Sequence, residues 1–313
     1  MSDGPQPGVY TVNSYIKTVS EEIPFVVIFN KRALAARALR QSGMEEAMRE
    51  RNLNYQVVDA TTPEEARCAA EEAARAGHIA VAAGGDGTIR DVVSGVLAAD
   101  NPEAVVGHVP LGTGNDLARG LGRVGHGIER ALDALRERRY ILIDVGQVNS
   151  EYFVNVLGIG FDAEVAVRQS SRKIKIPTYF LDAVHSMFSY QPQTYRARWP
   201  DGERTGAAMM ITAMNGIFEG GGVKLAPKAS LEDGLLDVYW IDPVSRWQFA
   251  RYVWAVRWGT HGDLPMVQYI RTDRITVESN SRLQYHLDGE YREMTAGGSL
   301  EIVLHHRRLP LII

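Results

Sequence analysis

The sequence predicts two domains of different class: a doubly wound α/β domain and, after it, a mainly antiparallel β-sandwich domain. In the first part of the chain, short apolar runs alternate with amphipathic helical patterns, as in a parallel sheet covered by helices. This alternation stops near Tyr140, and short β candidates dominate from there. The 313 residues suffice for two hydrophobic cores. We place the first domain at 1–142 plus about 306–313, and the second at 143–305.

The first domain is predicted to place several polar loops on one edge of its sheet. Thr62, Pro63 and Glu65 fit the N-cap, N1 and N3 positions of a capping box. Ligands bind at the carboxyl ends of the strands in such sheets, so segments that follow strands should share one rim. These segments are Asn30, Gly84–Thr88 and Gly112–Asp116. The predicted strands are 24–30, 54–59, 78–83 and 105–110, and the predicted helices are about 33–51, 63–77 and 88–99.

The second domain is predicted from runs of β-branched, aromatic and aliphatic residues separated by turn residues. Asn149–Glu151 joins the first two runs as a hairpin, and one long helix over about 246–258 interrupts the later ones. The apolar tail Leu309–Ile313 is expected to pack back on the first domain. The predicted strands are 141–148, 152–157, 208–214, 235–241, 267–277, 283–287 and 300–305.

The turn Gly84–Thr88 lies between a buried apolar strand and an amphipathic helix, and it combines three glycines with one carboxylate. The glycines allow positive φ and a close approach of the backbone to a ligand. The N–H groups and the dipole at a helix start favour an anion such as phosphate. Asp86 would repel that phosphate unless a cation or a substrate hydroxyl lies between them. The simpler alternative is that Asp86 is only a turn former.

Composition limits the class of partner. The net charge of −4 makes the whole chain a poor partner for nucleic acid. Cys68 is the single cysteine, which excludes an internal disulfide and is typical of a reducing compartment. Met1–Gly8 lacks the features of a signal peptide, and no apolar run approaches the ~18 residues of a transmembrane helix. We expect a cytoplasmic protein without a transmembrane segment, which meets any lipid from the aqueous side.

A set of glycine-rich and acidic segments carries a family resemblance. In order along the chain they resemble the bacterial diacylglycerol-kinase-type lipid kinases, relatives of sphingosine and ceramide kinases, over roughly residues 24–307. The resemblance implies a first domain like those of phosphofructokinases and NAD kinases. The segments are Gly84–Thr88, Pro110–Asp116, Asn155–Ala163, Gly220–Val238 and Leu287–Glu290.

The resemblance implies an ATP- and Mg²⁺-dependent kinase whose acceptor is a hydroxyl of a diacylglycerol-like or sphingoid lipid at a membrane surface. It implies a catalytic carboxylate network of Asp86, Asp116 and Asp144, with Glu290 as general base. It also implies a structural Mg²⁺ site at Asp233 with the carbonyls of Ser230 and Leu235. The expected nucleotide-binding residues are Asn30, Lys31, Thr61, Thr62, Gly84, Gly85, Asp86, Gly87, Thr88, Gly112 and Thr113.

One segment departs from the family pattern. The family's first strand normally ends in Asn-Pro-x-Ser-Gly, whereas this chain has Asn30-Lys31-Arg32-Ala33-Leu34. Lys31 and Arg32 are interpreted either as charged phosphate contacts or as solvated surface residues. The choice of nucleotide therefore stays open, and two other functions are retained: an NAD kinase-like soluble kinase, and a nucleotide- or lipid-binding protein that has lost catalysis.

Several of these residues also have purely structural interpretations. Asn115 or Asp116 can cap a helix, and Asp144 can accept hydrogen bonds in a turn. Asp233-Gly234 and Asp288-Gly289-Glu290 fit β-turns. The glycines at 220–222 fit a mobile loop or a tight bend.

The helix at 246–258 has three interpretations. Trp247, Trp254 and Trp258 follow helical spacing, with arginines nearby. A basic, tryptophan-rich helix can lie in a membrane interface. We favour the alternatives, in which the tryptophans pack on the sheet or form a homodimer contact.

Overall fold

The structure is a computed structural model that describes residues 16–30, 36–122, 128–170, 185–187 and 189–313. Two compact units share the chain. The α/β unit holds the described residues up to Ile143 together with Arg307–Ile313, and the β-sandwich unit holds Asp144–His306. The chain passes between the units within strands β6 and β17. Lys31 and Arg32 lie outside the described residues.

The α/β unit is built on parallel strands in the order β5-β4-β2-β3. Leu311 near the end of β17 adds a parallel neighbour to Val106 of β5, which confirms that the apolar tail packs on this unit. Lys17 and Thr18 pair with the start of β6. The strands are β1 (Lys17–Thr18), β2 (Phe25–Asn30), β3 (Tyr55–Ala60), β4 (Ile79–Gly84), β5 (Val106–Pro110), β6 (Arg139–Val148) and β17 (Ser299–Ile312).

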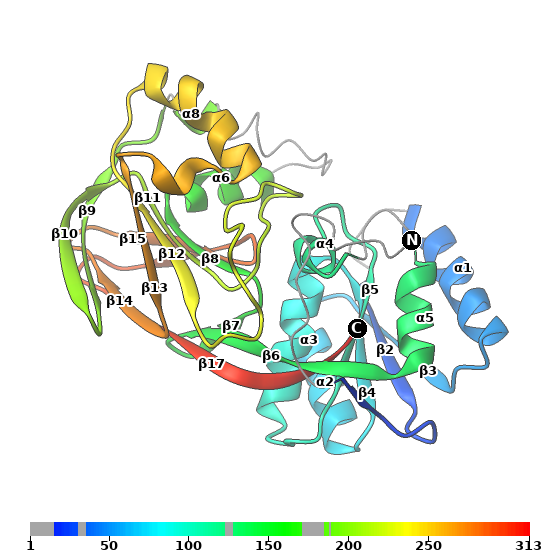
Figure 1. The fold of residues 1–313 in the computed structure, drawn as a ribbon. Helices are drawn as coiled ribbons and strands as arrows, with labels where there is room; N and C mark the ends of the chain where they lie inside the picture. The colour runs from blue at the N-terminus through cyan, green and yellow to red at the C-terminus, as the bar shows by residue number, and fades with distance from the viewer. Residues whose placement is uncertain (1–15, 31–35, 123–127, 171–184, 188) are drawn as a thin grey trace, which may run out of the picture. The chain divides into compact units, whose positions relative to one another are not determined.

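Helices cover both faces of this sheet, as the doubly wound class requires. Helices α2 and α3 lie along one face and α1 and α5 along the other (Figure 1). Every residue of β4 is buried, which explains its continuous apolar run. Thr62 caps α2 through the predicted capping box, with Pro63 at N1. The helices are α1 (Ala36–Glu50), α2 (Pro63–Arg75), α3 (Asp86–Ala98), α4 (Asp116–Gly120) and α5 (Glu129–Glu137).

The β-sandwich unit packs two antiparallel layers around one core. The six-stranded layer has the order β13-β12-β11-β8-β15-β16, and the layer facing it contains β10, β9, β14 and β17. Trp240, Leu157 and Leu287 from the first layer share the core with Tyr195 and Ile302 from the second. The elements are β7 (Glu151–Phe153), β8 (Val156–Gly160), α6 (Phe161–Ser170), β9 (Gln193–Trp199), β10 (Gly202–Ala208), β11 (Met210–Met214), β12 (Leu236–Ile241), α8 (Arg246–Trp258), η1 (His261–Asp263), β13 (Val267–Thr272), β14 (Arg274–Glu278), β15 (Leu283–Leu287) and β16 (Glu290–Met294).

Two predicted strands are each broken in the structure. The run 267–277 turns at Asp273, so that β13 pairs with β12 while β14 pairs with β17 in the opposite layer. The run 152–157 divides into β7 and β8 because the backbone of Val154 and Asn155 donates to a distant carboxylate. Neither break carries a glycine or proline, so the sequence pattern gives no warning of it. No helix among the described residues is both long and apolar enough to span a membrane.

Candidate active site

The predicted rim of the α/β unit brings together the ends of β2, β4 and β5. Gly84–Thr88 follows β4, and Gly112–Asp116 follows the neighbouring β5. Asn30 at the end of β2 donates from Nδ2 to Thr88 Oγ1 at 3.3 Å. His108 on β5 lies behind the first loop, with Nε2 3.3 Å from the carbonyl oxygen of Gly84. The two glycine loops and Asn30 therefore form one continuous polar edge.

The glycines of this rim are required by close packing rather than by backbone conformation. Gly84, Gly85 and Gly87 were expected to use positive φ, and that prediction is wrong because none of them does. A Cβ atom on Gly112 would lie 2.4 Å from Gly85 Cα and 2.7 Å from Asn115 Oδ1. A Cβ atom on Gly84 would lie 2.2 Å from Thr88 Oγ1. Gly85 and Gly112 allow the two loops to touch, and Gly84 makes room for Thr88 within the first loop.

Asp86 links the two loops. Its Oδ1 atom accepts the backbone N–H of Asp116 at 2.8 Å, at the start of α4. The carboxylate thus stabilises the positive end of that helix from outside it. Asn115 occupies the N-cap position with a left-handed φ of 52° and makes no side-chain cap. Instead, its amide closes the second loop, since Oδ1 accepts the N–H of Gly112 at 2.9 Å and Nδ2 donates to the Gly112 carbonyl at 2.8 Å.

Other predicted nucleotide-binding residues have structural roles or lie at the surface. Thr62 accepts the N–H of Glu65 at 3.1 Å, and Thr61 donates from both its N–H and its hydroxyl to Glu65. Thr113 is exposed on the second loop. Lys31 lies outside the described residues.

In the β-sandwich unit, Asp144 on β6 holds the turn that contains Asp233. Asp144 is fully buried, and its carboxylate accepts the N–H of Gly234 at 2.7 Å and lies 2.9 Å from His306 Nδ1. Asp233 accepts the N–H of Leu235 at 3.1 Å and forms an ion pair with Arg271. Asp144 therefore holds the turn in place, while the Asp233 carboxylate at its surface is charge-balanced by a guanidinium.

Glu290 follows a two-residue hairpin turn. Asp288 and Gly289 have φ values of 47° and 85°, the left-handed pair of a type I′ turn. Asp288 is largely buried, and its two oxygens accept the N–H groups of Val154, Asn155 and Val156 at 2.8, 2.8 and 2.9 Å. Glu290 begins β16 with a partly exposed carboxylate 3.6 Å from Arg292. The buried Asp288 carboxylate holds the turn in place, and the partly exposed Glu290 carboxylate lies beside the turn.

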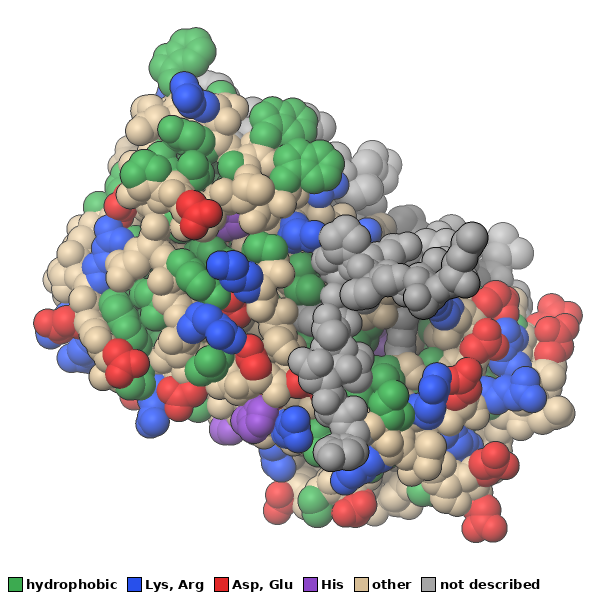
Figure 2. Space-filling model, in the orientation of Figure 1, with side chains coloured by type: hydrophobic (Ala, Val, Ile, Leu, Met, Phe, Trp, Pro, Cys, Tyr) green, Lys and Arg blue, Asp and Glu red, His purple; other side chains and the backbone are tan. Residues whose placement is uncertain are grey.

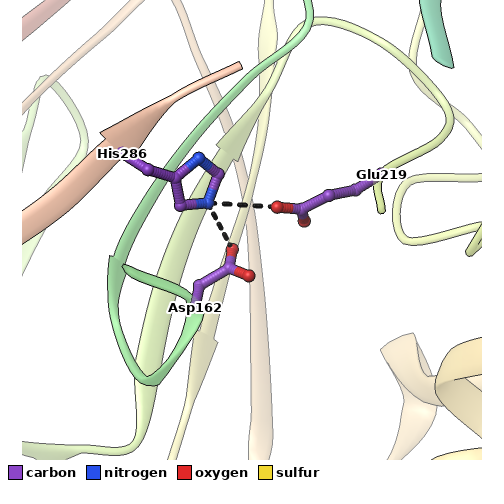
Figure 3. A group of neighbouring side chains, drawn as sticks. All are labelled: Asp162, Glu219 and His286. Atoms are coloured by element: carbon purple, nitrogen blue, oxygen red, sulfur yellow. Dashed lines mark ion pairs between the residues drawn. The ribbon is translucent and has the colours of Figure 1, made fainter. Parts of the chain in front are cut away.

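A buried cluster lies close to this hairpin, formed by Asp162, Glu219 and His286 (Figure 3). His286 Nε2 lies 3.2 Å from an Asp162 oxygen and 3.1 Å from a Glu219 oxygen. The imidazole Nδ1 faces the N–H of Gly289 at 3.2 Å, which ties the cluster to the hairpin. A Cβ on Gly158 would lie 2.2 Å from Asp162 and 2.3 Å from His286, so this glycine makes room for the cluster.

The two titrating partners of the cluster hold protons more tightly than usual. Burial, reinforced by the neighbouring charge of Asp162, raises the pKa of Glu219 to about 8. Burial alone would lower the pKa of His286, but the charge of Asp162 and the hydrogen bonds to both carboxylates outweigh it and raise that pKa to about 10. His286 is therefore a buried imidazolium at neutral pH. One nitrogen and two carboxylate groups within 4.8 Å also form a set of ligands that a divalent cation can use.

The sequence pattern contains almost no indication of this cluster. Asp162 lies in one of the family segments, but Glu219 and His286 are 57 and 124 positions further along and have no metal-ligand spacing. The one local signal is the glycine run after Glu219. Gly220, Gly221 and Gly222 all have positive φ, and Glu219 pairs with Val223 through both backbone groups at 2.9 Å. These glycines form a tight bend that turns Glu219 inward.

Family models match the chain in two successive stretches. A diacylglycerol kinase catalytic domain matches residues 24–148, and a YegS C-terminal NAD kinase beta sandwich-like domain matches residues 155–302. A solved structure described as a diacylglycerol kinase from Bacillus anthracis has a similar fold, with a TM-score of 0.69 at 19% identity, over 92% of this chain and 96% of that one.

Two relatives are similar in sequence over most of their length. A diacylglycerol kinase of Bacillus subtilis is 34% identical over 244 residues, which cover 76% of this chain and 79% of the relative. A YegS-like lipid kinase of Chromohalobacter salexigens is 32% identical over 226 residues, covering 71% and 72% of the two chains. With both domains matched in order and with relatives at this identity, the chain belongs to the diacylglycerol kinase family of lipid kinases.

Proposed function

We propose that this lipid kinase transfers the γ-phosphoryl group of ATP to a hydroxyl of a diacylglycerol-like or sphingoid lipid, with Mg²⁺. The observation that carries the proposal is the direct contact between the loops Gly84–Thr88 and Gly112–Asp116. The contact aligns a helix start with a second glycine loop at the carboxyl ends of neighbouring parallel strands. Backbone N–H groups at such an edge favour a phosphate chain.

The nucleotide is proposed to bind along this rim. Gly84, Gly85, Gly87 and Gly112 supply backbone that no side chain shields, and Thr88 and Thr113 supply hydroxyl groups. Asn30 orients Thr88 through the 3.3 Å contact between their side chains. The remaining proposed nucleotide contacts are Lys31, Thr61, Thr62 and Asp86.

Glu290 is proposed as the general base. The lipid hydroxyl loses its proton to the Glu290 carboxylate as its oxygen bonds to the γ-phosphorus and the bond to ADP breaks. The position fits this role because the hairpin is held rigidly by Asp288 while the Glu290 carboxylate stays accessible. Asp86, Asp116 and Asp144 are proposed as the supporting carboxylate network, in which Asp86 contributes its negative charge as well as the acceptor for the Asp116 N–H.

Mg²⁺ is proposed at the turn of Ser230, Asp233 and Leu235. The donors in this turn are hard oxygens, the type that Mg²⁺ prefers. Arg271 is the side chain that a bound cation would have to accommodate. Because Arg271 already pairs with the Asp233 carboxylate, a cation there must share that group with the guanidinium. The bound cation would supply electrostatic stabilisation of the turn and its surroundings.

A lipid acceptor is supported by an apolar cavity of about 100 Å³ in the β-sandwich unit. It lies under α8, at the ends of β11 and β12, and most of its wall is aliphatic, aromatic or thioether. Among its lining residues are Phe161, Met210, Ile241, Phe249 and Val256. Such a wall suits an acyl chain and offers little to a polar acceptor such as a dinucleotide.

The residue assignment is tested with Glu290→Gln and the matched control Glu293→Gln on the same strand. Transfer of labelled γ-phosphate to diacylglycerol in vesicles should fall at least 100-fold in the first variant and stay within twofold in the second. Equal rates in the two variants would remove Glu290 from the mechanism. Calorimetry with ATP and Mg²⁺ on the wild type tests separately whether the rim binds nucleotide. A chain that binds no ATP at millimolar concentration cannot use ATP as its phosphoryl donor.

A further inference from the structure

The outer face of α8 carries a stripe of tryptophans. Trp247, Trp254 and Trp258 expose 86%, 58% and 66% of their surface. Positions separated by seven and eleven residues return to within about 20° of the first on a helix with 3.6 residues per turn. The three indoles therefore project along one line. Figure 2 shows hydrophobic side chains gathered over α8 at the top of the view, with basic side chains beside them. Our prediction that these tryptophans pack on the sheet is wrong.

The opposite face of α8 accounts for the packing of the helix. Phe249, Tyr252 and Val256 line the apolar cavity, and Phe249 lies edge-on to Phe161 with 5.9 Å between ring centroids. Ser245 and Gln248 form a capping box at the start of the helix, and Gly259 ends it in a left-handed conformation. The helix is thus anchored without help from its outer face. All three indoles keep more than half of their surface exposed, although exposed tryptophan is costly in water.

The charge on α8 has one sign. Arg246, Arg251 and Arg257 are its charged residues, and the helix contains no aspartate or glutamate. Arg246 and Arg251 are exposed. Arg257 lies with its guanidinium 5.4 Å from the centre of the Trp258 ring and donates to the Gly222 carbonyl at 2.7 Å. This basic face stands out in a chain whose net charge is −4, and it complements an anionic surface.

We propose that the outer face of α8 docks on an anionic phospholipid bilayer, with the three indoles in the interface and the arginines against headgroup phosphates. Indole rings combine an apolar body with an N–H group, which suits the boundary between headgroups and acyl chains. Basic side chains beside them add attraction to anionic lipid. The proposal rests on the proposed function only in that a lipid kinase must reach its acceptor at a membrane.

The test measures binding of the full chain, without nucleotide, to sedimented vesicles of phosphatidylcholine in which about one lipid in three is the anionic phosphatidylglycerol. Trp247→Ala/Trp254→Ala/Trp258→Ala should weaken binding at least tenfold. Arg246→Gln/Arg251→Gln should weaken it on anionic vesicles and leave it unchanged on pure phosphatidylcholine. The matched control Arg274→Gln/Arg282→Gln removes two exposed arginines elsewhere in the same unit and should bind as wild type.

Two results would overturn the proposal. One is a triple tryptophan variant that binds anionic vesicles as tightly as wild type. The other is a combination of two findings: the wild type is dimeric by light scattering, and the triple variant is monomeric but binds vesicles as the wild type does. That combination would assign the face to a second copy of the chain.

Thermal unfolding and turnover on a short-chain, water-dispersed acceptor should be unchanged in the triple variant. Wild type that binds vesicles but transfers no phosphoryl group would contradict the proposed function alone.

Discussion

Asp86 and Asp288 do the same physical work in two different units, because each carboxylate accepts backbone N–H groups from a separate segment of the chain. Asp86 accepts the N–H of Asp116, from a loop that follows the neighbouring parallel strand. Asp288 accepts three N–H groups from Val154 to Val156, more than 130 residues earlier in the chain. Parallel strands in βα alternation align their loops predictably. Antiparallel strands paired over long distances do not, so the partners of Asp288 come only from the structure.

Burial also separates the carboxylates that stabilise the fold from those that are accessible to a ligand. Asp288 and Asp144 are buried and bind backbone N–H groups, whereas Glu290 and Asp233 lie at the surface of the turns that those residues fix. At each turn a buried aspartate positions an accessible acidic side chain. Replacing Asp288 should therefore cost stability, and replacing Glu290 should cost activity.

The largest effect is expected from Asp288→Ala. The substitution leaves three buried N–H groups without their acceptor, which should lower the free energy of unfolding by about 3–5 kcal/mol. Chemical denaturation followed by circular dichroism measures the change. Glu290→Ala, two residues away and partly exposed, is the control and should change it by less than about 0.5 kcal/mol. Similar losses in both variants would contradict the assignment of Asp288 as the structural member.

A pH-dependent effect is expected from Glu219. A carboxyl whose pKa is raised to about 8 in the folded state stabilises the fold fully below its ordinary value near 4.5 and loses that contribution as pH rises through 8. The His286 imidazolium acts in the same direction, since its contribution is lost as pH rises toward about 10.

Glu219→Gln removes the first of these contributions. The fall in unfolding free energy between pH 6 and pH 9 should be smaller in this variant than in wild type by about 2 kcal/mol. Denaturant titrations at a series of pH values measure it, with the exposed Glu301→Gln as control. A variant whose stability falls with pH as steeply as that of wild type would show that Glu219 does not hold the extra proton.

Asp86→Ala should lower the free energy of unfolding by about 1–2 kcal/mol, because one helix-capping contact is removed. Asp86→Asn retains an oxygen that can accept the Asp116 N–H and should be within about 0.5 kcal/mol of wild type. Phosphoryl transfer should fall at least 100-fold in both variants. If the asparagine variant is fully active, Asp86 is a capping residue and nothing more.

The smallest effect is expected from Thr62→Ala, compared with Ser245→Ala. Each residue forms the capping box of its helix, so each substitution should cost about 1 kcal/mol. Only Thr62, which follows β3 at the carboxyl edge of the parallel sheet, is a proposed nucleotide contact, so only its variant should raise the KM for ATP, by about threefold. Thermal melts and initial rates measure the two properties. An equal KM in the two variants would remove Thr62 from the nucleotide site.

The sequence predicted more of the α/β unit than of the β-sandwich unit, for a physical reason. Strand ends, capping residues and glycine loops are local signals, and they place Gly84–Thr88 and Gly112–Asp116 on one rim from the sequence alone. The bounds of α8 agree with the helix predicted at about 246–258, and the structure shows Ser245 and Gly259 capping its ends. The outward direction of its tryptophans was not, since a helix that is apolar on both faces does not indicate which face is buried.

We propose that this chain phosphorylates a lipid and not a soluble dinucleotide. The two acceptors are compared in separate reactions of the wild-type protein with ATP and Mg²⁺. One reaction contains anionic vesicles with diacylglycerol, the other contains NAD, and the labelled γ-phosphate is followed in both. Label should enter the lipid at least 100-fold faster than it enters NAD. Label in NAD and none in lipid would contradict the proposal.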